Sequence, residues 1–402
     1  MDFSLNEEQR EWQLKARKFA REEIRPLSLP RDRIPDPRET FDWDIIKKGS
    51  KLGFRTLAVG KQWGGHGADL VTQVIVMAEL AKADSAISKT FSQCWKWSHL
   101  IATVCTPEQQ ERFLRPFVTD DTYLLGAAQT EPNASSDNRL PPENDPRAGW
   151  KLKAERHGDE WILNGEKCLI ANGGVGKLFF VNTRTNPNVN IKQGTTTFLV
   201  PSDTPGFRFG KVFNKNGWRF YQNAELIFEN ARVPHANMVG EVNGGVKARN
   251  RDLSHFSDLE LAGNALGICD AAVEMAMQYA SARTEQGKPL IGHQTVELRL
   301  SEMHVLTEAL RAFVMRTAWE RELAVRGDPR AGSFMHASFV MIFSKNTVQR
   351  VTRLNMDIHR TVGMMDAGAE KLARDAAIWT HLAGSTLLQI KSIRDLAHAE
   401  RK

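Results

Sequence analysis

The sequence lacks the features of a secreted, membrane-spanning or metal-binding protein. It has only four cysteines in 402 residues, none spaced with another cysteine or a histidine as zinc ligands are. We therefore expect no disulfide and no bound metal. No stretch of about 18 consecutive apolar residues occurs, so no membrane span is expected. The N-terminal MDFSLNEEQREW carries acidic residues early and no apolar core, which argues against a signal or transit peptide and favours a cytoplasmic location.

Common nucleotide-binding and catalytic motifs are missing as well. The sequence has no G-x-G-x-x-G after a strand, no G-x-x-x-x-G-K-[ST], no G-x-S-x-G and no H-E-x-x-H. These absences argue against Rossmann and P-loop nucleotide binding, and against the common serine hydrolases and metalloproteases. The net charge of +6 comes from basic residues spread along the chain. Without a basic stripe or a known module, nucleic acid is not an expected partner.

What is present is the composition of a globular protein of several domains. Hydrophobic residues make up 41% of the chain and charged residues 25%. The first 120 residues have helical periodicity and predict an N-terminal helical domain, residues 1–120. Its first amphipathic segment, LNEEQREWQLKARKFAREEIRPL, is predicted to end before Pro26. A later helix begins at TPEQQERFLRPFV, with Pro107 in its first turn.

The pattern then changes to short strands and later returns to helices. WKLKAERHGDEWILNG alternates on both sides of His157-Gly158-Asp159, which predicts a hairpin. Further strands bounded by proline, asparagine and glycine indicate a small β-barrel or sandwich domain over residues 121–240. From 241 to 402 apolar residues recur every three or four positions, typical of a bundle of about four helices. The expected fold class is therefore α+β, mainly α.

Six segments, in order, resemble those of a known family. QTEPNASSD (129–137) resembles T-E-P-x-A-G-S-D, and LNGEKCLIANGG (163–174) resembles N-G-x-K-x-W-I-T-N. VPSDTPGF and NAELIFENARVP follow, ARTEQGKPL resembles R-x-x-F-G-K-P, and RDAAIWTHLAGST resembles R-D-A-x-I-x-x-I-Y-E-G-T. Over nearly its whole length the chain is similar to the acyl-CoA dehydrogenases.

The resemblance implies an FAD-dependent oxidoreductase that performs α,β-dehydrogenation of an acyl-CoA thioester. It also implies FAD in a cleft between the β domain and the bundle, and a homotetramer or homodimer in which a neighbouring subunit contacts part of the FAD. Electron-transfer flavoprotein is an implied electron acceptor. Matched position by position, the cofactor-binding residues are Thr130, Ser136, Ala171, Arg283, Gln294, Gly384 and Ser385. Of these, Arg283 would meet the pyrophosphate, and Ser136 would also line the substrate cleft together with Lys96 of the Trp95-Lys96-Trp97 segment.

The same resemblance shows where this sequence departs from the family. The glutamate of Y-E-G-T, which removes the α proton in most members, is Ala383 here. A minority of members place that glutamate on the first long helix of the bundle, where this chain has Ser257. Asp258 is the nearest candidate base; the competing and more common role for such a residue is that of a solvated helix residue or an ion-pair partner. The lower-ranked candidate bases are Glu260, Asp366 and His255. Near the cofactor, Leu169 stands where a tryptophan normally flanks the flavin, Ala171 replaces a threonine and Gln286 a phenylalanine.

Three interpretations stay open. The chain is a dehydrogenase that uses a non-standard base; or it performs other flavin or CoA chemistry, as desulfinases, N-hydroxylases and monooxygenases of this fold do; or it is the base-lacking partner subunit of a heteromeric acyl-CoA dehydrogenase.

Overall fold

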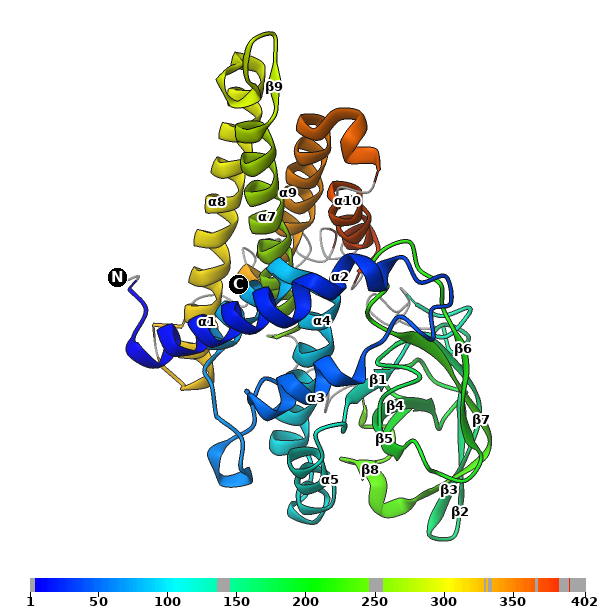
Figure 1. The fold of residues 1–402 in the computed structure, drawn as a ribbon. Helices are drawn as coiled ribbons and strands as arrows, with labels where there is room; N and C mark the ends of the chain where they lie inside the picture. Colours follow the sequence, from blue (N-terminus) through cyan, green and yellow to red (C-terminus); the bar gives the residue numbers. More distant parts are fainter. Residues whose placement is uncertain are drawn as a thin grey trace.

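The computed structural model describes residues 4–135, 145–245, 256–328, 330–331, 335–365, 368–382 and 390, without the side chains of residues 257 and 335–337. The chain forms a helical region, then a β-sheet domain, then a second helical region (Figure 1). This confirms the predicted, mainly helical α+β architecture.

The first helical region ends at α5. Its helices are α1 (Glu7–Phe19), α2 (Arg25–Asp32), α3 (Trp43–Lys51), α4 (Leu70–Val104) and α5 (Pro107–Thr119). The first helical segment ends before Pro26, as predicted, but no loop follows it. A π-helical turn over residues 20–24 leads directly into α2, where Pro26 occupies the first turn. Proline is tolerated there because the N–H that it lacks would have no partner within that helix.

The middle domain is one strongly curved sheet. Its strands are β1 (Leu125–Ala128), β2 (Lys153–His157), β3 (Glu160–Ala171), β4 (Leu178–Arg184), β5 (Thr195–Pro201), β6 (Phe207–Val212), β7 (Asn223–Pro234) and β8 (Met238–Val239). They run in the order β6-β7-β3-β2-β4-β5-β8, and β1 pairs parallel with β4. The predicted hairpin is confirmed, since His157 of β2 pairs with Glu160 of β3 around the turn. Large side chains such as Trp161, Phe179 and Phe198 fill a separate core inside this sheet.

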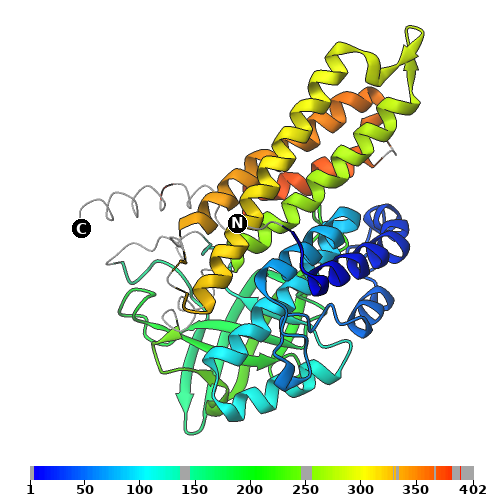
Figure 2. The same ribbon diagram turned by 90° about the vertical axis from the view of Figure 1, so that its left-hand side faces the viewer.

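The second helical region is a bundle that projects away from the sheet (Figure 2). It contains α7 (Ser257–Ala282), α8 (Gln294–Val325), α9 (Met335–His359) and α10 (Ala369–Ala377). The short antiparallel strands β9 (Thr284–Glu285) and β10 (Lys288–Pro289) form its far tip between α7 and α8. The predicted four-helix bundle is thus confirmed.

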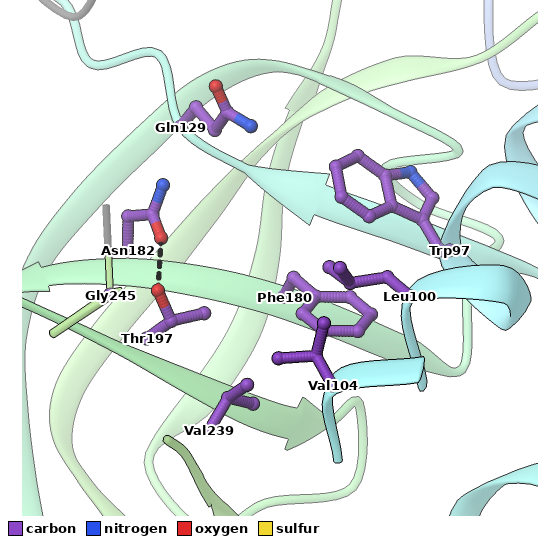
Figure 3. Close-up of a pocket in the computed structure, with 9 residues that line it drawn as sticks. All are labelled: Trp97, Leu100, Val104, Gln129, Phe180, Asn182, Thr197, Val239 and Gly245. Carbon is purple, nitrogen blue, oxygen red and sulfur yellow. Dashed lines mark hydrogen bonds between the residues drawn. The ribbon is translucent and has the colours of Figure 1, made fainter. Parts of the chain in front are cut away.

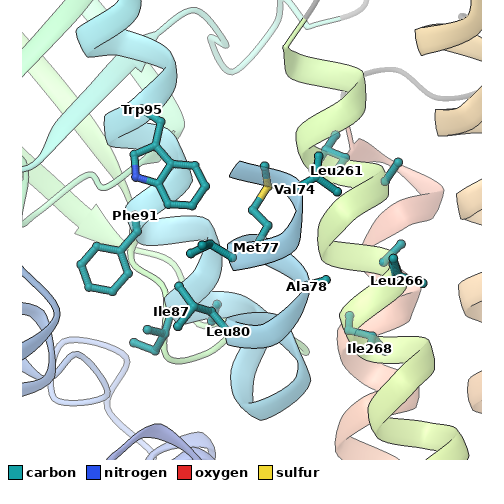
Figure 4. Packing of buried hydrophobic residues seen from close by; sticks show 14 of the residues in the cluster. Val74, Met77, Ala78, Leu80, Ile87, Phe91, Trp95, Leu261, Leu266 and Ile268 are labelled. Atoms are coloured by element: carbon teal, nitrogen blue, oxygen red, sulfur yellow. The ribbon is translucent and has the colours of Figure 1, made fainter. Parts of the chain in front are cut away.

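Helices α4 and α7 join the two helical regions through a shared apolar core (Figure 4). Their closest approach is at Gly267 of α7, where an added Cβ would lie 2.4 Å from the backbone oxygen of Ala78 in α4. A side chain there would separate the two helices, so glycine sets their spacing. Because α4 also packs on β1, this contact fixes the bundle relative to the sheet.

Candidate active site

The end of strand β3 carries a bulge that turns an apolar side chain outward. Pairing with β7 shifts register between Lys167 and Ile170, and Leu169 has a left-handed backbone with φ of 56°. Leucine seldom adopts this conformation because its Cβ crowds the backbone. Bulges often re-aim a side chain near functional sites. Here the bulge leaves Leu169 52% exposed.

A hydroxyl-bearing loop lies beside this bulge. The backbone N–H of Cys168 donates to the carbonyl oxygen of Thr130 at 2.9 Å, which places the Thr130 loop next to Leu169. Thr130 is half-buried, and so is Ala171 at the end of β3. We call Thr130, Leu169 and Ala171 the β3 rim.

A buried ion pair holds the Thr130 loop in place. The Nζ of Lys167, which is fully buried, lies 2.8 Å from Oε1 of Glu131. The Glu131 carboxylate also accepts hydrogen bonds from the backbone N–H groups of Lys151 and Leu152, at 2.6 Å and 3.0 Å. Burial lowers the pKa of Lys167 to about 8, against the opposing charge of Glu131. These contacts attach the Thr130 loop to β3 and to the segment that precedes β2.

A narrow slot lies between α4 and the sheet, and Gln129, the residue before Thr130, lines it (Figure 3). Its walls are Trp97, Leu100, Val104, Gln129, Phe180, Asn182, Thr197, Val239 and Gly245. Its cavity volume is about 10 Å³, roughly that of one water molecule. Lys96, the predicted substrate-binding residue, is half-buried with its Nζ 4.8 Å from the centre of the Trp97 ring. Lys96 is therefore adjacent to the slot.

The remaining described cofactor candidates lie at the far tip of the bundle. Arg283 follows α7 and has a side chain 57% exposed, with Nε 3.8 Å from Glu285. Gln294 is the first residue of α8 and is also exposed. Figures 1 and 2 both show this tip at the opposite end of the bundle from the sheet. One chain therefore brings Thr130 and Ala171 together but leaves Arg283 and Gln294 apart from them.

The two described candidate bases on α7 face different neighbours. The Asp258 carboxylate accepts a hydrogen bond from Oγ of Ser338 on α9 at 3.2 Å and is 5% exposed. Asp258 is also close enough to Arg321 for their charges to interact. Burial lowers the pKa of Arg321 to about 10, and the negative charges of Glu320 and Asp258 oppose this lowering. Glu260 instead faces α4 and forms an ion pair with Lys89.

Comparison with known proteins identifies the family. Three family models match the chain: acyl-CoA dehydrogenase N-terminal domain over residues 6–121, middle domain over 126–231 and C-terminal domain over 249–397. The acryloyl-CoA reductase (NADH) of Anaerotignum propionicum is 32% identical over 94% of this chain and 91% of its own length. This chain belongs to the acyl-CoA dehydrogenase family.

Other members agree along the whole chain. A probable acyl-CoA dehydrogenase of Bacillus subtilis is 28% identical over 97% of both chains. The solved butyryl-CoA dehydrogenase of Megasphaera elsdenii superposes with a TM-score of 0.89 at 28% identity, covering 99% of this chain and 100% of that one. The chain is thus an oxidoreductase of the acyl-CoA dehydrogenase type, and enzymes of this family are flavoproteins.

The β3 rim fits a flavin. A flat ring system needs an exposed apolar face with hydrogen-bonding groups at its polar edge. The bulge supplies the face through Leu169, and Thr130, a hydroxyl-bearing residue, lies in the adjacent loop. Among the described residues, no group of three or more histidine, cysteine, aspartate or glutamate side chains could hold a metal ion. No helix in the described part of the chain is long and apolar enough to cross a membrane.

Several predicted site residues fall outside the described residues: Ser136, His255, Asp366, Ala383, Gly384, Ser385 and the side chain of Ser257. Two features of the site were not predicted from the sequence. The Glu131–Lys167 pair joins residues 36 positions apart, and the Lys89–Glu260 pair joins two helices. The sequence signal for the Lys89–Glu260 pair is Glu260 itself, an acidic residue inside the otherwise apolar run LELAGNALG.

Proposed function

We propose that this chain is an FAD-dependent dehydrogenase that removes hydrogen from the α and β carbons of an acyl-CoA thioester, using a base in a non-standard position. The observation that supports the proposal is the β3 rim. There the outward-facing side chain of Leu169 lies beside the Thr130 loop, which the buried Glu131–Lys167 ion pair holds in place. When bound, the flavin supplies the acceptor for the hydride of the β carbon. Family membership supports this chemistry.

The chain's own residues divide the binding of FAD between two places. At the rim, Leu169 would cover one face of the ring and the Thr130 hydroxyl would bond its polar edge. At the tip, Arg283 presents a guanidinium fork suited to a pyrophosphate, and Gln294 an amide for the adenine end. Since these residues lie at opposite ends of the bundle, we infer that a second chain completes each site.

An exposed apolar face on α8 supports such an assembly. Leu298 and Val305 are 66% and 65% exposed, and Trp319 is 36% exposed. Their spacings of seven and fourteen residues place all three on one side of the helix. We propose a homotetramer, with a homodimer or a heteromer with a homologous subunit as the alternatives. All four cysteines are free thiols, which supports a cytoplasmic location, where electron-transfer flavoprotein would accept the electrons.

Complementation tests the shared site. Leu169→Asp removes the rim contact and Arg283→Ala removes the tip contact, so each variant alone is expected to purify without the visible absorbance of flavin. Co-expressed, the two variants can assemble one site from an intact rim and an intact tip, and flavin is expected to return. If the wild-type protein is colourless and binds flavin only when co-expressed with a homologous chain, the proposed function is wrong and the chain is a partner subunit of a heteromeric acyl-CoA dehydrogenase.

Removal of the α proton requires a base within hydrogen-bond reach. We propose Asp258 for this role, because it adjoins Ser257, the alternative family position. Its carboxylate must turn from Ser338 towards the β3 rim to act. Asp258→Asn is expected to slow flavin reduction by an acyl-CoA by about 100-fold or more, while Ser338→Ala, which keeps the carboxylate, is expected to retain the rate. An unchanged rate in Asp258→Asn excludes Asp258.

A further inference from the structure

A group of four buried polar side chains lies where α4 meets α7. Glu260 is 1% exposed, and its Oε1 lies 2.7 Å from Nζ of Lys89. The same oxygen accepts hydrogen bonds from Oγ of Ser92 at 2.5 Å and Nε2 of Gln93 at 3.0 Å. We call Lys89, Ser92, Gln93 and Glu260 the Glu260 cluster. None of its members belongs to the cofactor contacts described above.

One end of the cluster adjoins the slot. Oε1 of Gln93 accepts a hydrogen bond from the indole N–H of Trp97 at 3.0 Å. The Trp97 ring is a wall of the slot, and Gln129, the residue before Thr130, forms another wall. Trp97 therefore links the cluster to the wall of the slot, which Gln129 also lines.

The other end of the cluster approaches the end of β3. Tyr221 is 3% exposed, and its hydroxyl makes no hydrogen bond of ordinary geometry among the described residues. Burial raises the pKa of Tyr221 well above its usual value; the charge of Glu260 adds to this, and the backbone N–H of Asn172 opposes it. Asn172 directly follows Ala171 of the β3 rim. The cluster thus lies between the slot and the rim, beside a buried hydroxyl with a free hydrogen-bonding position.

Stability does not explain the cluster. A buried ion pair is often no more stable than apolar side chains of the same volume, because both charges lose their hydration. The pair also retains capacity for a ligand. Within the described residues, the ammonium of Lys89 has only Glu260 as a partner, although it carries three donors. Oε2 of Glu260 receives only the 3.4 Å contact from Gln93.

The charge around the cluster indicates what would bind. Burial raises the pKa of Glu260, but the charges of Lys89 and Lys96 and its hydrogen bonds outweigh burial, so the pKa is lowered and the carboxylate is anionic. Burial lowers the pKa of Lys89, against the opposing charge of Glu260. Lys89 carries three N–H donors, of which the described residues use one for Glu260. An oxygen that accepts hydrogen bonds would complement the remaining donors.

We propose that the Glu260 cluster binds an oxygen-bearing substituent of the acyl group, so that this site takes hydroxyl- or carboxyl-substituted acyl thioesters in preference to unsubstituted ones of the same size. Lys89 donates to the substituent, and Glu260 orients the ammonium. This inference rests on the proposed function, because it concerns the acyl group of the same substrate.

Calorimetric titration of the purified protein with three CoA thioesters tests the preference. Pentanoyl-CoA and 4-hydroxybutyryl-CoA differ by the exchange of a terminal methyl for a hydroxyl, and succinyl-CoA carries a carboxylate. Wild-type protein is expected to bind at least one of the two oxygen-bearing thioesters about 10-fold more tightly than pentanoyl-CoA, the value of one hydrogen bond to a charged group. Comparing those two distinguishes hydroxyl from carboxylate recognition.

Variants then assign the preference to the cluster. Lys89→Met removes the ammonium with little change of volume and is expected to abolish the preference. Ser92→Ala removes one hydrogen bond but no charge, and is expected to weaken the preference several-fold. This milder variant still tests the proposal if Lys89→Met does not fold. Asp270→Asn is the control, because Asp270 forms a similar pair with Arg311 at 2.5 Å further along α7, and should keep the wild-type preference.

The outcomes separate the two proposals. Equal affinities for the three thioesters in the wild type overturn the inference and leave the proposed function standing. So does a preference that both Lys89→Met and Ser92→Ala retain. A wild-type protein that binds none of the three thioesters, nor CoA, contradicts the proposed function itself and the inference with it.

Discussion

At the scale of single residues, the candidate site contains residues in unfavourable backbone conformations or unfavourable environments. Leu169 has a left-handed backbone and an exposed apolar side chain, and Lys167 carries its ammonium in a fully buried position. Both are maintained by surrounding structure: the pairing of β3 with β7, and the carboxylate of Glu131. Strained backbone conformations and buried charged groups are commonly found at functional sites.

Lys167→Met tests the importance of the buried pair. Loss of the ammonium leaves the Glu131 carboxylate buried without its counter-charge, so the free energy of unfolding is expected to fall by about 3 kcal/mol. Lys177→Met is the matched control, because Lys177 pairs with Asp120 at the surface and should cost less than about 1 kcal/mol. Urea unfolding monitored by circular dichroism measures both. Equal losses would show that Lys167 contributes no more than a surface lysine.

The same lysine predicts a pH dependence of stability. Burial lowers its pKa to about 8 in the folded protein, from an ordinary value of 10.5. Between these values the unfolded state binds more protons than the folded state, so this group makes the free energy of unfolding rise with pH from about 8 to about 10. Below about pH 8 the amine is protonated in both states, so its contribution no longer changes with pH. Urea unfolding of wild type and Lys167→Met across this range should show the rise in wild type alone; parallel curves contradict it.

At the scale of elements, the α4–α7 contact determines how the bundle sits on the rest of the chain. The two helices carry both the shared apolar core and the Glu260 cluster. Their separation is set by Gly267, which leaves no room for a side chain against α4.

Two glycines of α7, one turn apart, give a paired test. Gly267→Ala places a Cβ 2.4 Å from the Ala78 oxygen and 2.6 Å from the Ala81 Cβ, and is expected to destabilise the protein by about 1–3 kcal/mol through overpacking. In Gly263→Ala the nearest atoms lie 3.6 Å away, so the gain in helix propensity should stabilise it by up to about 1 kcal/mol. Thermal unfolding measures both. The same sign for both substitutions would contradict the assigned contact.

At the scale of the whole molecule, the residues proposed to bind FAD fall into two separate groups, and α8 has an exposed apolar face. The β3 rim belongs to the sheet domain, whereas the tip that carries Arg283 lies at the end of the bundle away from the sheet. Self-association through α8 would cover Leu298, Val305 and Trp319 and remove their apolar surface from water.

Substitution on this face tests the assembly. Val305→Glu places a charge in the middle of the α8 face and is expected to lower the mass measured by light scattering to that of a smaller species. Leu14→Glu is the control, because Leu14 is a similarly exposed apolar residue on α1, at 54%, and should leave the mass unchanged. If Val305→Glu retains the wild-type mass, α8 does not form the interface.

Local patterns predicted the elements well, because their determinants are local. Helical periodicity, alternation around His157-Gly158-Asp159 and the glycine and proline boundaries each act within a few residues. The boundary before Pro26 also has a local cause, since proline fits the first turn of the new helix α2. The assignment of Thr130 and Ala171 to the cofactor site stays a prediction, and the fold places the Thr130 loop beside the end of β3.

By itself, the sequence determined the order of the three regions and the resemblance to the family, and it predicts that the usual acid is missing at positions 383 and 257. Only the tertiary structure decided that Asp258 faces α9 while Glu260 faces α4, since two residues along a helix turn a side chain by more than half a revolution. It also decided the Glu131–Lys167 and Lys89–Glu260 pairs and the distance between the rim and Arg283. These depend on contacts between residues far apart in the chain, and no local pattern encodes which buried charges will meet.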